Sequence, residues 1–293
     1  RQVFHYGDWL ALDRAGAVAN SVYGATDEAY IADIYYAASA QIVAKAAAVL
    51  GLEETRQNYQ AIADRQWQVV EEEYFTATGR CAVKTQTGLV LALKYHLSDN
   101  ERLTEQMLRK LLRDNKNKLN TGFVGTPLLC NVLTEHGMTD LAYRLLLNEE
   151  YPGWLHEVKL GATTVWERWN SLDENGRISS TGMNSLNHYS YGAVLEWIFR
   201  HVAGIDVTEQ GPGGKMMRIS PKVDHKLGSA SAVYDSASGC YRCGWQIENG
   251  DQITVTVTVP FGAKAQVILP YAPDSVYHDT DNPLFETVEN GIC

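Results

Sequence analysis

The sequence predicts a mainly α-helical protein, in which antiparallel helical hairpins form part of an α/α toroid and a small antiparallel β-sandwich follows. Two observations support this fold class. The first two thirds of the chain carry apolar residues at helical spacing, in segments joined by short polar connections. The composition then changes at Gly211–Gly214, beyond which apolar residues alternate as they do in strands. We therefore expect a helical domain at 1–208 and a β-sandwich domain at 209–293.

The helical region divides into seven predicted helices. An acidic first turn begins the first helix near Thr26, and Gly51 ends it. A second long helix is expected from Leu52 to Phe75. Shorter helices are predicted at 86–97, 101–113, 124–137 and 139–148, and the last at Ser185 to Val202, after an irregular stretch from Glu149 to Thr181. In a toroid of antiparallel hairpins, irregular connections lie at one end of the barrel and are the usual place for a binding site.

The alternating pattern beyond residue 211 predicts strands at 217–219, 245–247, 253–259 and 265–269. The last segment, Asp281 to Cys293, has no clear pattern. Cys240 and Cys243 form a CxxC motif within strand-like sequence. Since a zinc site needs a second ligand pair and a redox site needs a helix start, we expect a structural role for this pair.

Charge and composition exclude several classes of function. The formal net charge of −10 provides no surplus of Lys and Arg, so nucleic acid and anionic membranes are not expected partners. No uncharged apolar run reaches the roughly 18 residues that a membrane span needs, and Arg1–Tyr6 does not resemble a signal peptide. The five scattered cysteines favour a reducing compartment, and hence the cytoplasm. Asp and Glu residues lack ligand spacing, so no metal or other cofactor is expected.

The most informative stretch is Gly161–Trp169, which places Glu167 between Trp166 and Trp169. Indole faces suit the apolar C–H faces of sugar rings, and a carboxylate at the centre of such a wall can act as an acid or a base. The alternative is that these tryptophans belong to the core of the toroid. A buried core rarely accepts an unpaired glutamate, so we favour Glu167 as a catalytic residue.

Further candidates for substrate binding surround this stretch. Trp154 lies just upstream, in the loop 151–156, and Asp8 and Trp9 repeat the pairing of an acid with an indole. His188, which we place at the opening of the last helix, can bind a substrate hydroxyl or orient a water molecule. Helix-capping or hydrogen-bonding roles are the alternatives for Asp8 and His188. The segment Thr121–Pro127 predicts a turn and a helix opened by proline, with a structural role.

Together, Gly161–Trp169, Tyr6–Leu10 and Asn187–Val194 resemble the bacterial α-L-rhamnosidases of glycoside hydrolase family 78. Further stretches also resemble that family, namely Thr121–Leu133, Asp140–Trp154, Glu196–Gly204 and Met217–Lys222. The resemblance implies an (α/α)6 catalytic barrel, a C-terminal β-sandwich, and hydrolysis of terminal α-L-rhamnosides with inversion. Glu167 matches the general base of the family. His188 and Trp9 match residues of the family that contact rhamnose. Trp154 and Asp8 also match such residues, but the match is weaker.

The chain departs from the family in one respect. The family's general acid lies on a segment ending in Gly-Trp-Thr-Gly-Asp, upstream of the region that matches Gly7–Trp9, and this segment is absent here. We therefore expect the chain to be the C-terminal portion of a longer enzyme, with its acid supplied from upstream. Catalytic inactivity of such a fragment is one expectation, and a homodimer that covers its open helix faces is another.

Three other interpretations remain open. A toroid glycosidase acting on another sugar has the same architecture. A carbohydrate-binding fragment without catalysis needs only the aromatic wall. A scaffold of helical repeats is disfavoured, because the helix pairs lack a fixed period and a scaffold does not explain the Glu167 loop.

Overall fold

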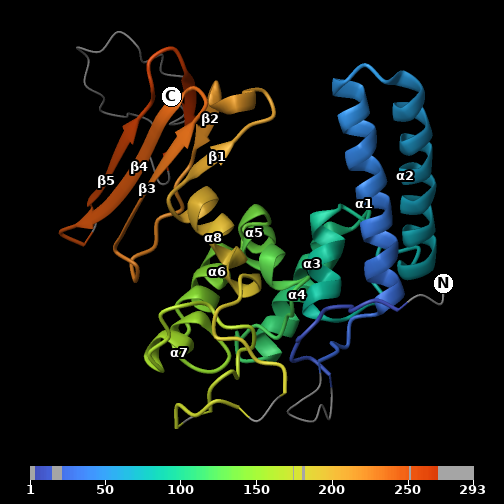
Figure 1. The fold of residues 1–293 in the computed structure, drawn as a ribbon, viewed down its shortest axis with the longest axis horizontal. Coiled ribbons are helices and arrows are strands. Elements are labelled where there is room, and N and C mark those ends of the chain that lie inside the picture. The colour runs from blue at the N-terminus through green and yellow to red at the C-terminus, as the bar shows by residue number, and fades with distance from the viewer. Residues whose placement is uncertain (1–3, 15–21, 174, 180–181, 251, 270–293) are drawn as a thin grey trace. The chain divides into compact units, whose positions relative to one another are not determined.

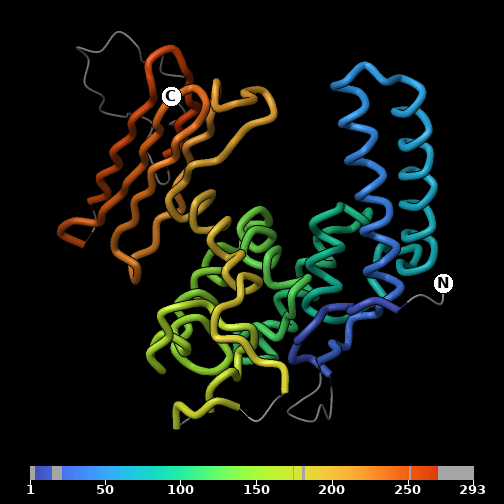
Figure 2. The backbone as a smooth tube through the Cα atoms, viewed as in Figure 1, coloured from blue at the N-terminus to red at the C-terminus, as the bar shows by residue number. Residues whose placement is uncertain are grey.

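The computed structural model describes residues 4–14, 22–173, 175–179, 182–250 and 252–269. The chain forms two compact units, Arg1–Ala193 and Val194–Cys293 (Figures 1 and 2). The segment Asp281 to Cys293 lies outside the described residues. In the part of the chain that is described, no helix has both the length and the apolar composition required to span a membrane.

Helical hairpins build the first unit, as predicted. Its helices are α1 (Glu28–Val49), α2 (Glu53–Tyr74), α3 (Gln86–Lys94), α4 (Glu101–Asp114), α5 (Thr126–Glu135), α6 (Thr139–Leu146) and α7 (Trp154–Lys159). Consecutive helices pack in pairs, α1 with α2, α3 with α4 and α5 with α6, and α3 also packs against α1 and α5. The prediction of antiparallel hairpins joined by short connections is therefore confirmed.

Local signals in the sequence determine the helix ends. The Asp27 side chain accepts a hydrogen bond from the Tyr30 backbone N–H and caps α1, and Thr85 caps α3 in the same way through Gly88. Gly51 has a φ of +71°, which suits glycine and separates α1 from α2. Proline lies in the first turn of α5, as the sequence predicts.

Two features of the helical unit differ from the prediction. The short helix α7 lies in the stretch expected to be irregular, because six residues are too few to show a helical period. His188 is not in a helix, since the chain becomes helical only at a 3₁₀ helix, Ser190–Ala193. The backbone N–H of His188 instead donates to the Val165 carbonyl at 2.8 Å, and this pairing holds the segment in a non-helical conformation.

The second unit begins with α8 (Val194–Trp197) and a π-helical turn (Ile198–Val202). Its two three-stranded sheets have the strand orders β1-β2-β6 and β3-β4-β5. The strands are β1 (Ile205–Val207), β2 (Met216–Ile219), β3 (Ser229–Ser236), β4 (Gly239–Glu248), β5 (Gln252–Thr258) and β6 (Lys264–Val267). The pairs are antiparallel except β2 and β6, which are parallel, because the chain forms the whole other sheet between these two strands.

The core of the second unit lies between its sheets. Ile205, Met217, Ile219, Tyr241 and Cys243 pack together and are buried. The Trp245 indole N–H donates to the Val202 carbonyl at 2.7 Å, which joins the π-helical turn to β4. This bond lies within the compact unit that starts at Val194.

The CxxC cysteines both lie on β4, which confirms the strand prediction for this motif. Residues three apart on a strand point to opposite faces. Accordingly, Cys243 is buried and Cys240 is partly exposed, and both are free thiols. Neither is placed to act jointly with the other.

Candidate active site

The segment that carries Glu167 is fixed by backbone hydrogen bonds. The Glu167 backbone N–H donates to the Ser185 carbonyl at 2.9 Å, so that residues 165–167 lie beside residues 185–188. On the other side, the Arg168 backbone N–H donates to the Ser171 hydroxyl at 3.2 Å, and the Arg168 guanidinium Nε donates to the Met183 carbonyl. The backbone that carries the Glu167 side chain is therefore held in place on both sides.

Glu167 is 8% exposed, and its carboxylate has no hydrogen bond or ion pair with any residue that the structure describes. Neither carboxylate oxygen is completely cut off from solvent. A nearly buried carboxylate with free lone pairs can accept a proton from a water molecule, whereas a structural carboxylate is normally paired. The Glu167 carboxylate therefore has the free lone pairs that a general base requires.

Three tryptophans pack around this segment. Trp154, Trp166 and Trp169 are 9%, 2% and 1% exposed. Trp169 stacks on the Tyr191 ring with centroids 4.0 Å apart and meets Trp154 edge to face at 5.3 Å. The Trp154 indole N–H donates to the Tyr191 carbonyl at 2.9 Å. These indoles are covered by protein, so they pack as core residues and do not form the open aromatic wall that the sequence suggested.

Asp8 is also buried, at 1% exposure. Its carboxylate accepts hydrogen bonds from the Thr87 hydroxyl at 2.5 Å and from the backbone N–H groups of Gly122, Val124 and Gly125 at 2.8–3.1 Å. Burial raises the pKa of Asp8, while these hydrogen bonds act in the opposite direction. Because protein donors occupy both oxygens, Asp8 organises the loop 121–125 and is not placed to bind a sugar hydroxyl.

The loop held by Asp8 connects Trp9 with His188. The Phe123 backbone N–H donates to the Trp9 carbonyl at 2.9 Å, and the Phe123 ring stacks on the His188 ring with centroids 5.1 Å apart. Gly122 is required here, since a Cβ atom would lie 2.2 Å from the Trp9 carbonyl oxygen. The sequence analysis assigned this loop a structural role and did not single out Phe123. An aromatic residue between two glycines, Gly122 and Gly125, is the signal that could have identified it.

Trp9 and His188 are the two candidates that remain partly exposed. The Trp9 ring meets the rings of Tyr6 and Tyr23 edge to face, with centroids 5.0 and 5.3 Å away. His188 Nδ1 accepts a hydrogen bond from the Ser190 backbone N–H at 3.3 Å, so that in the neutral ring Nε2 carries the proton. These side chains can present an aromatic face and a hydrogen-bond donor to a ligand.

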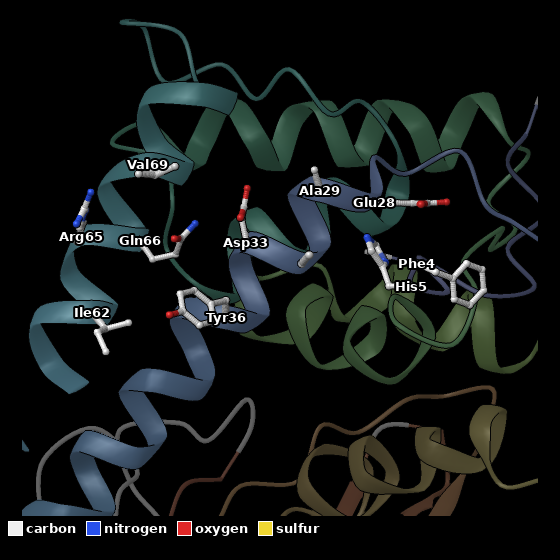
Figure 3. Close-up of a pocket in the computed structure, with 11 residues that line it drawn as sticks. Phe4, His5, Glu28, Ala29, Asp33, Tyr36, Ile62, Arg65, Gln66 and Val69 are labelled. Carbon is white, nitrogen blue, oxygen red and sulfur yellow. The ribbon is translucent and has the colours of Figure 1, made fainter. Parts of the chain in front are cut away.

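A separate cavity of about 930 Å³ lies between α1 and α2 (Figure 3). It is lined by residues such as Glu28, Asp33, Tyr36 and Arg65, with Phe4 and His5 at one end. None of the sequence-predicted site residues lines it. We found no cluster of three or more His, Cys, Asp or Glu side chains with the geometry of a metal site among the described residues.

Comparisons with known proteins agree with this architecture. The family model described as bacterial alpha-L-rhamnosidase 6 hairpin glycosidase domain matches residues 1–202, and that of the bacterial alpha-L-rhamnosidase C-terminal domain matches residues 204–282. The first unit therefore falls in the class of six-hairpin glycosidase domains. More particularly, the chain belongs to the bacterial α-L-rhamnosidase family.

Individual relatives show the same likeness. An α-L-rhamnosidase of Formosa agariphila is 36% identical over 91% of this chain and 29% of its own length, and one of Alteromonas sp. (strain LOR) is 37% identical over 90% and 29%. The crystal structure of Streptomyces avermitilis α-L-rhamnosidase complexed with L-rhamnose has a TM-score of 0.85 and 33% identity, covering 100% of this chain and 27% of that one. The native Aspergillus terreus enzyme has a TM-score of 0.85 and 30% identity, with coverages of 92% and 31%. The chain thus spans less than a third of these relatives.

Proposed function

We propose that this chain contributes the general base and part of the sugar site to an enzyme that hydrolyses terminal α-L-rhamnosides with inversion. The observation that carries the proposal is the unpaired, nearly buried carboxylate of Glu167 on a rigidly held segment. Membership of the α-L-rhamnosidase family supports the choice of sugar. The relatives named above are called α-L-rhamnosidases, and one of them was solved with L-rhamnose.

In this mechanism Glu167 removes a proton from a water molecule on the face of the sugar opposite the leaving group. Water then attacks the anomeric carbon while a carboxylic acid protonates the departing oxygen. Inverting glycosidases hold the two carboxyl groups roughly 6.5–9.5 Å apart, so that the water fits between them. We assign the acid to a segment outside these 293 residues, since the family's acid-bearing motif is absent from the sequence.

Trp9 and His188 are our proposed contacts with rhamnose, because both are partly exposed and the Phe123 loop connects them. Trp9 offers an aromatic ring to the C–H bonds and methyl group of the sugar, and His188 offers a donor to a hydroxyl. Asp8, Trp154, Trp166 and Trp169 then act indirectly, by fixing the loops that carry these contacts and the base.

The experiment that tests the sugar class is a panel of aryl glycosides with the same good leaving group, which requires no acid assistance. We expect the intact enzyme, meaning the longer protein that includes this chain, to cleave the α-L-rhamnoside. This chain alone should cleave it at a lower rate. The α-D-glucoside and the β-D-glucuronide should be cleaved far more slowly. Preference for another glycoside would favour a toroid glycosidase of different specificity. Rhamnose binding without turnover of any substrate would favour a non-catalytic carbohydrate-binding protein.

Replacing His188 with alanine is expected to raise KM for an aryl α-L-rhamnoside about fivefold, because one hydrogen bond to a sugar hydroxyl contributes about 1 kcal/mol. The expected change in kcat is smaller. Initial-rate kinetics in the intact enzyme measure both values. His225→Ala, at an exposed position of the second unit, serves as the control. An unchanged KM in His188→Ala would remove this residue from the sugar site.

A further inference from the structure

Two exposed tyrosines lie directly against the proposed rhamnose contacts and have no part in the mechanism above. Tyr189 is 84% exposed, and its ring stacks on the His188 ring with centroids 5.4 Å apart and planes 13° from parallel. Tyr6 is 59% exposed, and its ring meets the Trp9 ring edge to face at 5.0 Å. Each proposed sugar contact therefore has a second, more exposed aromatic ring beside it.

The two tyrosines belong to one connected row of aromatic residues. Phe123 joins the proposed contacts, because its backbone N–H donates to the Trp9 carbonyl and its ring stacks on the His188 ring. Ring contacts extend the row to Tyr6 at one end and to Tyr189 at the other. The row brings together three loops that are far apart in the sequence. Exposed aromatic surface that is continuous across several loops is typical of a binding site.

The segment that carries Tyr189 is held beside the Glu167 segment. The His188 backbone N–H donates to the Val165 carbonyl at 2.8 Å, and the Tyr189 carbonyl accepts a hydrogen bond from the Gly192 backbone N–H at 2.9 Å. The backbone of Tyr189 is therefore fixed on both sides. An aromatic side chain on a fixed backbone loses little conformational freedom when it binds a ligand.

Exposure increases from the proposed base toward Tyr189. Glu167 is 8% exposed, His188 is partly exposed and Tyr189 is 84% exposed. A terminal rhamnose that contacts the two more buried groups leaves Tyr189 for the part of the substrate beyond it, which is the group joined to rhamnose. The face of a tyrosine ring suits the C–H face of a pyranose, and its hydroxyl suits a sugar hydroxyl. The exposed amide of Asn187, next to this segment's His188, adds further hydrogen-bonding groups.

We propose that Tyr189, together with Tyr6, forms a platform that binds a second sugar ring, the one to which the terminal rhamnose is joined. The enzyme then prefers rhamnose linked to another sugar over rhamnose linked to a small alcohol. This specificity rests on the proposed function of Glu167.

Matched substrates separate binding of the second ring from the chemistry of cleavage. Methanol and a sugar hydroxyl are both alcohols, so methyl α-L-rhamnoside and an α-L-rhamnosyl-glucose disaccharide differ mainly in the ring that follows rhamnose. In the intact enzyme, we expect Tyr189→Ala to lower kcat/KM about fivefold for the disaccharide and less than twofold for the methyl rhamnoside. Tyr6→Ala should show the same selectivity with a smaller loss.

Two further variants serve as controls. Tyr189→Phe keeps the aromatic ring and should stay within about twofold of the native kcat/KM on both substrates. Phe261→Ala removes a fully exposed ring from the second unit and should change neither. Equal losses on both substrates in Tyr189→Ala would show that Tyr189 only supports His188, and no loss on either would show that its ring binds nothing. A loss on phenyl α-L-rhamnoside without one on the disaccharide would assign the platform to aromatic groups. Each of these results would overturn the proposal.

Calorimetry on the Glu167→Gln variant separates this proposal from the proposed function, because that variant should bind substrates without cleaving them. The disaccharide should bind about fivefold more tightly than methyl α-L-rhamnoside, and adding Tyr189→Ala should remove the difference. If the difference appeared while the native enzyme cleaved neither substrate, the role of Glu167 would be contradicted and the platform would stand. Cleavage by the native enzyme without any difference in affinity would overturn the platform and leave the base in place.

Discussion

Replacing Glu167 with glutamine is expected to lower kcat of the intact enzyme on an aryl α-L-rhamnoside by about 10²–10⁴-fold, the range that general acid–base assistance contributes. Glutamine has nearly the same shape but cannot accept a proton from water. The backbone bonds from Glu167 to Ser185 and from Arg168 to Ser171 do not involve the replaced group, so the segment should keep its conformation. Rhamnose affinity, measured by calorimetry, should change by less than about threefold.

The control for this substitution is Glu71→Gln, at an exposed position of α2, which should keep native kcat. If Glu167→Gln retained native kcat, Glu167 would not be the base. If neither the native enzyme nor the variant showed turnover, while both bound rhamnose equally, the carbohydrate-binding interpretation would replace the enzymatic one.

Replacing Asp8 with alanine is expected to destabilise the helical unit by on the order of 3–5 kcal/mol. The substitution would leave the Thr87 hydroxyl and the buried N–H groups of Gly122, Val124 and Gly125 without their acceptor. Each unsatisfied buried donor costs about 1–3 kcal/mol. Asp8→Asn should have an intermediate effect, because its amide group keeps one oxygen and directs its NH₂ at groups that are themselves donors.

Urea unfolding followed by circular dichroism measures these changes. The exposed α2 residue Asp64 provides a control, and Asp64→Ala should change stability by less than about 0.5 kcal/mol. A similarly small effect of Asp8→Ala would show that the loop 121–125 is held by other contacts. In that case the contacts of Phe123 with Trp9 and His188 would not depend on Asp8.

The long helices and the strands β2, β4, β5 and β6 followed from local pattern alone. Helices α1 and α2 are each 22 residues long, enough for several periods of the apolar pattern and for end signals such as Asp27 and Gly51. Strand β3 was missed because its Ser- and Ala-rich sequence has little apolar alternation, and its conformation depends on pairing with β4. Pairing over a distance also determines the conformation of His188, which a local helix prediction could not anticipate.

The sequence indicated which residues carry the chemistry of the candidate site, but it did not indicate how far each side chain is exposed to solvent. An acid flanked by two indoles indicated Glu167 directly. Whether an indole faces a ligand or packs inside depends on tertiary contacts, such as the stacking of Trp169 on Tyr191, which have no local signal.

The measurement that tests our central claim most directly is the anomeric configuration of the first product. The intact enzyme is incubated with an aryl α-L-rhamnoside, and the released sugar is followed by proton NMR before mutarotation. Because Glu167 is proposed to activate water for a single displacement, β-L-rhamnose should appear first. Initial formation of α-L-rhamnose would show net retention, and Glu167 could not then act as the base of an inverting reaction.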